Sequence, residues 1–125
     1  MTQEEKTILL QDLCARSPYG VICTDSRHGD SRITEINIVD EIVYCYDFDE
    51  YVELNKIKPY LRPMSSMTPE EFEEYTKLIK PVVFNKIKVN IASPESFDYL
   101  NKKMFDYRGL IEKGLALEAP NDMYK

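Results

Sequence analysis

Four carboxylates stand close together in the segment Asp47-Phe-Asp-Glu-Tyr-Val-Glu53. Hard cations such as Mg²⁺ and Ca²⁺ bind where several oxygens converge at short range. In an extended strand, however, Asp47 and Asp49 share one face while Glu50 lies on the other. The calcium-loop pattern of spaced acids around a central glycine is also missing. We therefore interpret Asp47, Asp49, Glu50 and Glu53 as a solvated hairpin tip, and we predict no metal and no cofactor.

The single histidine, His28, lies in the segment Asp25-Ser-Arg-His-Gly-Asp30. A histidine beside carboxylates can act as a general base because its pKa lies near neutrality. Paired with Cys23 or Cys45, it could activate a thiol nucleophile. Nothing in the sequence brings these groups together, and a turn rich in Gly, Ser and Asp explains the segment equally well. We predict no catalytic residue here and interpret the chain as a non-enzyme.

Two adjacent serines, Ser65 and Ser66, lie between Met64 and Met67. The chain has no G-x-S-x-G elbow around them and no second histidine to serve as a base. Turn and cap chemistry before a helix is the better interpretation. A small metal-dependent hydrolase is thus the least favoured of three candidate functions.

A lysine-rich stretch runs from residue 77 to residue 103, with aromatic residues interleaved. Lysines that attract phosphates, combined with aromatic rings that stack on bases, are typical of single-strand nucleic-acid binding. The net charge of −6 and the lack of clustered arginines oppose that function. We keep it as the alternative function. Its candidate contacts are Lys86, Lys88, Lys102 and Lys103.

Two tyrosine–arginine pairs, Tyr60 with Arg62 and Tyr107 with Arg108, lie in proline- and glycine-rich segments. Both residue types are enriched at interface hot spots. Both also bridge groups within a fold, so the structural and the interface role stay open. If the chain is an interaction module, these four residues are its candidate partner contacts.

The composition fits one soluble globular domain over residues 1–125, with 43% apolar and 30% charged residues. A chain of this length buries about two-thirds of its unfolded surface and folds without disulfides or metal. The charge is uneven, because residues 1–53 hold twelve acids against four bases, whereas residues 54–125 hold ten against twelve. This asymmetry favours a charged partner or self-association. Two solvated faces are the alternative.

The cysteines and the N-terminal segment indicate a cytoplasmic protein. Cys14, Cys23 and Cys45 are an odd set without C-x-x-C spacing, as expected of reduced thiols. The first residues lack the basic region and apolar run of a signal peptide. No stretch approaches the roughly 20 apolar residues of a membrane span, so we expect no membrane association.

Three capping signals predict three helices. Thr2 with Glu5, and Thr68 with Glu71, match the capping-box pattern, and Pro69 suits the first helical position. Ser93-Pro94-Glu95 opens the third helix. Each start is followed by apolar residues at helical spacing. The expected apolar positions are Ile8, Leu9 and Leu13 in the first helix, Phe72, Tyr75 and Ile79 in the second, and Phe97, Leu100 and Met104 in the third.

Alternating apolar and polar residues predict the strands. The clearest alternation places Ile42, Tyr44, Tyr46 and Phe48 on one aromatic-rich face. Pro59 and Pro63 predict an extended segment that leaves the sheet. We therefore expect an α+β fold, with a small curled or SH3-like antiparallel sheet of four or five strands and about three helices. The expected strands are 19–24, 34–38, 42–48, 52–54 and 87–91.

Three blocks of the chain resemble a family of small uncharacterised proteins from gut Bacteroides, related bacteria and their phages and mobile elements. The blocks are DLCARSPYGV at 12–21, KPYLRPMSSMTPEE at 58–71 and FDYLNKKMFDYRGLIEKGLALEAPNDMYK at 97–125. The resemblance implies a mobile-element setting and carries no known activity, cofactor or catalytic residue. Members of that family often have two histidines where this chain has Lys102 and Lys103.

Taken together, these features favour a non-enzymatic protein-interaction module, an accessory protein of a mobile element or phage. Its expected partner is another protein, from host or phage, or a second copy of itself.

Overall fold

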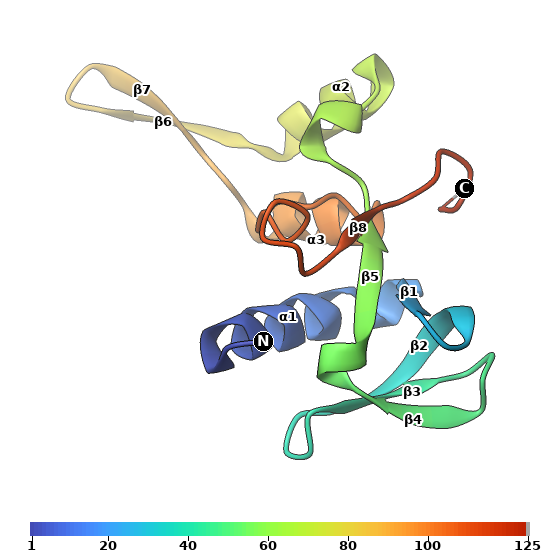
Figure 1. Ribbon diagram of the computed structural model, residues 1–125. Helices are drawn as coiled ribbons and strands as arrows, with labels where there is room; N and C mark the ends of the chain where they lie inside the picture. Colours follow the sequence, from blue (N-terminus) through green and yellow to red (C-terminus); the bar gives the residue numbers. More distant parts are fainter. Residues whose placement is uncertain (125) are drawn as a thin grey trace.

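The computed structural model describes residues 1–124, except for the side chains of residues 80–82, 84 and 88–91. The chain has an α+β fold with three α-helices, a six-stranded sheet and a separate two-stranded hairpin (Figure 1). No helix within this described part is long and apolar enough to cross a membrane. The helices are α1 (Gln3–Arg16), α2 (Pro69–Leu78) and α3 (Pro94–Lys102). The strands are β1 (Ile22–Asp25), β2 (Gly29–Asn37), β3 (Ile42–Cys45), β4 (Glu50–Glu53), β5 (Ile57–Leu61), β6 (Lys80–Phe84), β7 (Ile87–Ile91) and β8 (Leu117–Glu118).

The main sheet has the strand order β4-β3-β2-β1-β5-β8 and stays open. All neighbours are antiparallel except β5 and β8, which are parallel. The expected α+β class is confirmed, but the sheet has more than the four or five strands predicted. Two of its strands, β5 and β8, were not predicted. The Pro59 segment forms β5 and does not leave the sheet, because Cys23 of β1 pairs with Pro59.

The three predicted helix starts are confirmed. The hydroxyls of Thr2, Thr68 and Ser93 each accept a hydrogen bond from the backbone N–H three residues later. Pro69 and Pro94 occupy the first turns of α2 and α3, where no N–H is needed. These signals are local, so the sequence alone suffices to locate them.

The face predicted for residues 42–48 is wrong, and a bulge interrupts β2. A bulge between Ile33 and Glu35 shifts the register of β2, with Ser31 and Ile33 buried before it and Ile36 packed against the core after it. Ile38 lies in the turn that follows β2 and is exposed. The strand expected over 42–48 ends at Cys45 and buries its other face, with Val43 inside and Tyr46 in solvent. The aromatic-rich face is therefore the outer face of the sheet.

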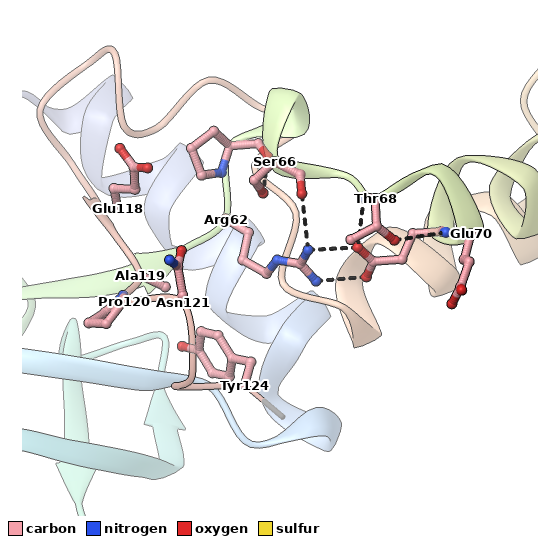
Figure 2. A pocket seen from close by; sticks show the side chains of 11 residues that line it. Arg62, Ser66, Thr68, Glu70, Glu118, Ala119, Pro120, Asn121 and Tyr124 are labelled. Carbon is pink, nitrogen blue, oxygen red and sulfur yellow. Dashed lines mark hydrogen bonds and ion pairs between the residues drawn. The ribbon is translucent and has the colours of Figure 1, made fainter.

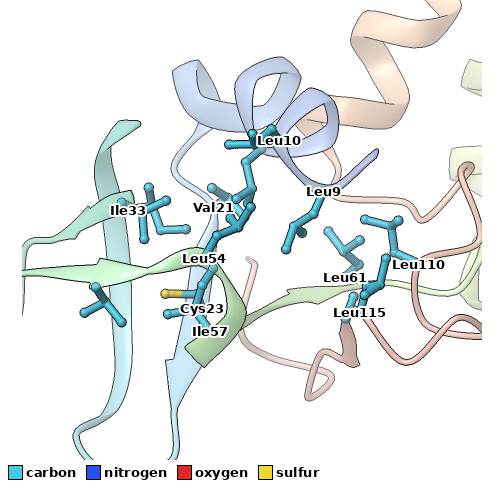
Figure 3. Close-up of a cluster of buried hydrophobic side chains, with 14 of the residues drawn as sticks. Leu9, Leu10, Val21, Cys23, Ile33, Leu54, Ile57, Leu61, Leu110 and Leu115 are labelled. Atoms are coloured by element: carbon cyan, nitrogen blue, oxygen red, sulfur yellow. The ribbon is translucent and has the colours of Figure 1, made fainter. Parts of the chain in front are cut away.

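The core lies between α1 and one face of the sheet. Leu9 and Leu10 of α1 point toward Val21, Leu54 and Leu61 (Figure 3). Cys23 and Cys45 lie in this core as free thiols with their sulfurs 3.9 Å apart. The C-terminal segment completes the core. The expected core residues Leu110 and Leu115 are buried, Ile111 is half-buried and Leu117 is exposed.

α2 and the hairpin β6–β7 form an arm, residues 69–91, that extends from the body (Figure 1). The expected apolar face of α2 is not buried: Phe72 is 59% exposed, and Tyr75 and Ile79 are only half-buried. β7 has the predicted bounds, but it pairs with β6 and not with the main sheet. In α3, Leu100 is buried as predicted, whereas Phe97 is largely exposed.

A buried ionic network ties α1 to the segment after α3. Asp12 and Arg16 are both fully buried, and the guanidinium donates to both carboxylate oxygens at 2.8 and 3.0 Å. Arg16 also donates to the carbonyl of Phe105 at 2.7 Å, and Arg108 donates to Asp12 at 2.8 Å. Moving a charged side chain out of water costs several kcal/mol per ion, so Asp12 and Arg16 both need partners of this kind.

We predict that Asp12→Leu lowers the free energy of unfolding by about 3–5 kcal/mol, because it leaves Arg16 buried without its counter-ion. Urea denaturation measures the loss. Asp12→Leu combined with Arg16→Met removes both charges and should be less destabilised than Asp12→Leu alone. A double variant as unstable as the single one would contradict the prediction.

Candidate partner-binding groove

A groove of about 450 Å³ lies between the start of α2 and the C-terminal segment (Figure 2). One wall comes from the end of β5, the short 3₁₀ turn Met64–Ser66 and the first turn of α2. The other comes from residues 118–121, with Tyr124 alongside. The residues that line it are Arg62, Pro63, Ser66, Thr68, Glu70, Glu71, Glu118, Ala119, Pro120, Asn121 and Tyr124.

Arg62 connects the groove to the body of the protein. Its two terminal nitrogens donate to the Glu71 carboxylate at 2.7 and 2.8 Å (Figure 2). Its guanidinium lies 4.2 Å from the ring centroid of Phe105. Its backbone N–H donates to Met104 and its carbonyl accepts from Asp106. A planar guanidinium that pairs with both carboxylate oxygens and stacks on a ring is held in one orientation, so this wall of the groove is rigid.

Glu71 both caps α2 and pairs with Arg62. It accepts the backbone N–H of Thr68 at 3.1 Å, which closes the capping box. Hydrogen bonds from Arg62, and then from Thr68, lower the pKa of Glu71 from 4.5 to about 2. The carboxylate is therefore ionised at neutral pH, and it neutralises Arg62.

The opposite wall is held by backbone pairing and by Tyr124. The N–H of Ala119 donates to Leu61 at 2.8 Å, which continues the parallel pairing of β8 with β5. The Tyr124 hydroxyl accepts from the N–H of Ile22 and donates to the carbonyl of Tyr60 at 2.7 Å. Burial raises the pKa of this phenol, so it stays protonated and able to donate.

The charge that remains in the groove is negative. Glu70 and Glu118 are exposed, and within residues 1–124 neither forms an ion pair. Since Glu71 is matched by Arg62, these two carboxylates face solvent uncompensated. Pro63, Ala119 and Pro120 add apolar surface beside them. The groove therefore offers an apolar surface flanked by two acids, which suits a segment with a basic side chain on an aliphatic stem.

Of the four predicted partner contacts, Arg62 lines this groove. Tyr60 donates its hydroxyl to Asp30 at 2.9 Å, and its pKa is raised by burial and by that contact. Tyr107 donates to Asn101 at 2.9 Å and stacks under the guanidinium of Arg108, 4.6 Å from its ring centroid. Tyr60, Tyr107 and Arg108 thus make contacts within the fold, and the structure does not bring all four into one surface.

The four predicted nucleic-acid contacts are also separated. Lys86 is exposed at the turn between β6 and β7, while Lys102 and Lys103 lie at the end of α3, beside the end of β5 (Figure 1). The side chain of Lys88 lies outside the described residues. The turn of the hairpin and the end of α3 point in opposite directions in Figure 1.

His28 does meet carboxylates, though not a thiol. Its ring nitrogens lie 3.2 Å from Asp25 and 3.3 Å from Glu50, and Phe48 stacks beside it. The pKa of Asp25 is lowered, first by the backbone N–H of Arg27 and then by His28. These contacts close the turns at one end of the main sheet.

The acidic cluster is spread over separate contacts. Asp47 accepts the N–H of Arg32 at 3.0 Å, Asp49 accepts the hydroxyl of Tyr44, and Glu53 lies exposed in β4. Among the described residues, no three His, Cys, Asp or Glu side chains are grouped so as to hold a metal ion. Ser66 donates to the carbonyl of Pro63 at 2.7 Å, as the predicted turn chemistry requires.

Comparison with known proteins adds no further assignment, since no protein-family model, curated protein or solved structure matches the chain. The groove therefore has to be interpreted from its own geometry.

Several groove residues escaped prediction from the sequence. Glu71 had been assigned only to the helix start, and Glu118, Asn121 and Tyr124 had no assigned role. One signal was available: a capping glutamate in the same rigid block as Arg62, nine residues later. Nothing in the sequence indicated that residues 118–124 would lie opposite that block.

The Arg62–Glu71 pair should make stability depend on acid pH. Because the pKa of Glu71 is lowered, its stabilisation is present above about pH 4.5 and is lost as the pH falls toward 2. Replacing Arg62 with Met removes the pair and keeps an aliphatic stem near Phe105. Between pH 7 and pH 3, the wild type should lose about 1–2 kcal/mol more unfolding free energy than Arg62→Met.

Urea denaturation across this pH range measures the difference. Arg32→Met removes an exposed arginine that lies 4.0 Å from Asp47, and its pH profile should match the wild type. Parallel profiles for the wild type and Arg62→Met would show that the pair does not lower the pKa of Glu71.

Proposed function

We propose that the protein is a non-enzymatic interaction module that binds a basic segment of another protein in the groove between α2 and residues 118–124. The observation that carries the proposal is the pair of uncompensated carboxylates, Glu70 and Glu118, beside the apolar surface of Pro63, Ala119 and Pro120. We propose a partner from the bacterial host or the phage, in line with the resemblance of three sequence blocks to phage and mobile-element proteins.

The rigidity of the groove supports a binding role. One wall is fixed by the two-point contact between Arg62 and Glu71, and the other by the backbone pairing of β8 and the buried hydroxyl of Tyr124. A preformed site avoids the entropy cost of ordering its own walls when a partner binds. The acidic rim would add specificity and speed of encounter more than raw affinity.

Nucleic-acid binding is less well supported. The acidic groove repels phosphate, and the described lysines Lys86, Lys102 and Lys103 lie at separate places. A binder that neutralises several phosphates needs its cations along one track. We therefore favour a protein partner.

Charge reversal in the groove tests the proposal. Tagged wild type and the Glu70→Lys/Glu118→Lys variant are used to capture proteins from host lysate, with and without nuclease, and the captured proteins are quantified by mass spectrometry. A partner bound in the groove should be recovered about tenfold less with the variant, which corresponds to about 1.4 kcal/mol.

The matched control is Glu53→Lys/Glu112→Lys. It makes the same change in net charge at exposed acids outside the groove. The control should recover the same partner as the wild type. Equal loss with both variants would indicate nonspecific charge attraction and contradict the groove, and capture that disappears with nuclease would favour nucleic acid.

A further inference from the structure

A second hollow, of about 530 Å³, lies where the β1–β2 turn meets the start of β5. Its lining comes from residues 24–27, residues 55–58 and Leu117 of β8. Small-molecule sites in proteins occupy about 300–1,000 Å³, so the hollow is large enough to hold a small ligand. It shares no lining residue with the proposed groove, so the two sites can be tested separately.

Three cations surround this hollow without a counter-ion. Arg27, Lys56 and Lys58 line it, all three are exposed, and within residues 1–124 none of them forms an ion pair. A hollow lined by charges of one sign concentrates the electric field and raises the local concentration of ions of the opposite sign. The hollow therefore attracts anions, although the chain as a whole carries a net charge of −6.

Asp25 is the one acid among the described residues that line the hollow, and both of its carboxylate oxygens are engaged within the turn. Oδ1 accepts the backbone N–H of Arg27 at 2.9 Å, and Oδ2 lies 3.2 Å from Nδ1 of His28. The nearby Asp30 lies outside the lining and accepts the hydroxyl of Tyr60. The lining therefore carries three positive charges and one negative charge, a net charge of +2.

The main sheet fixes the backbone beneath these cations. Lys58 of β5 pairs with Thr24 of β1, and its neighbours Ile57 and Pro59 are buried. Because successive residues of a strand alternate between faces, Lys58 projects from the face of the sheet opposite the core. The 3₁₀ turn Leu54–Lys56 leads directly into β5 and brings a second lysine to the same hollow.

We propose that this hollow binds a small organic phosphate, a phosphomonoester that is neutralised by Arg27, Lys56 and Lys58. Such a group carries about −1.5 to −2 charges at neutral pH, which matches the net charge of the lining. The guanidinium of Arg27 can donate to two phosphate oxygens, while the lysines act as point charges. The exposed side chain of Leu117 and the lysine stems offer apolar surface to the organic part.

The charge of the lining also discriminates between anions. The phosphodiester of a nucleic-acid backbone carries one negative charge per phosphate, and a carboxylate likewise carries one. Either would leave the lining with a net positive charge, so a phosphomonoester is the better match.

NMR titration of the ¹⁵N-labelled full chain with phenyl phosphate, at low ionic strength, tests the proposal. A ligand of this size should bind with a dissociation constant on the order of 1 mM and should shift the amide signals of residues 24–27 and 55–58. Phenyl sulfate has nearly the same shape but a single negative charge. It should bind about fivefold more weakly, because one unit charge is missing beside the cations.

The variant Lys56→Gln/Lys58→Gln removes two of the three cations and should weaken the binding of phenyl phosphate about tenfold or more. The matched control is Lys77→Gln/Lys86→Gln. It makes the same change in net charge at exposed positions outside the hollow, and it should bind phenyl phosphate as the wild type does. Circular dichroism checks that both variants stay folded.

Four outcomes would overturn the proposal. Absence of saturable shifts at about 20 mM phenyl phosphate excludes the site, and shifts centred on other residues place the binding elsewhere. Phenyl sulfate that binds as tightly as phenyl phosphate contradicts the match to a dianion. Equal weakening in the two double variants indicates diffuse charge attraction. A phosphoserine peptide that binds more than about tenfold more tightly than phenyl phosphate would assign the hollow to a phosphorylated protein instead.

Discussion

The packing of the elements of this protein depends on one constraint, the buried ion pair between Asp12 and Arg16. Both side chains are fully buried, so neither charge can recover its hydration by a small movement. Each must keep the partners that the fold supplies, and two of those, the carbonyl of Phe105 and the guanidinium of Arg108, come from far along the chain. The pair therefore fixes the first helix against the segment that follows the third.

Phe105 connects this ion pair to the groove, because it contacts both Arg16 and Arg62. Its carbonyl accepts from Arg16, while its ring lies under Arg62, which in turn holds Glu71 and the start of α2. Two arginines thus approach one residue from different elements, one through its carbonyl and one through its ring. This arrangement holds the first turn of α2 against the body, although no described residue of that helix is buried. The groove is rigid for the same reason.

The proposed groove is acidic and shaped, which favours a basic segment of an unlike protein. The uneven charge of the chain had indicated a charged partner or self-association without a location for either. In the function that we propose, Glu70 and Glu118 attract such a partner, because Arg62 already neutralises Glu71.

Local chemistry allowed the sequence by itself to determine the three helix starts, the α+β class and the bounds of β7. A capping hydroxyl, a proline in the first turn and a two-residue alternation all act within a few residues. Only the tertiary structure decided that Pro59 stays in the sheet, that a bulge between Ile33 and Glu35 shifts the register of β2, and that Arg62 meets Glu71 opposite residues 118–124. Each of these outcomes depends on contacts between residues that are far apart in the sequence. The spacing of residue types along the chain does not indicate such contacts.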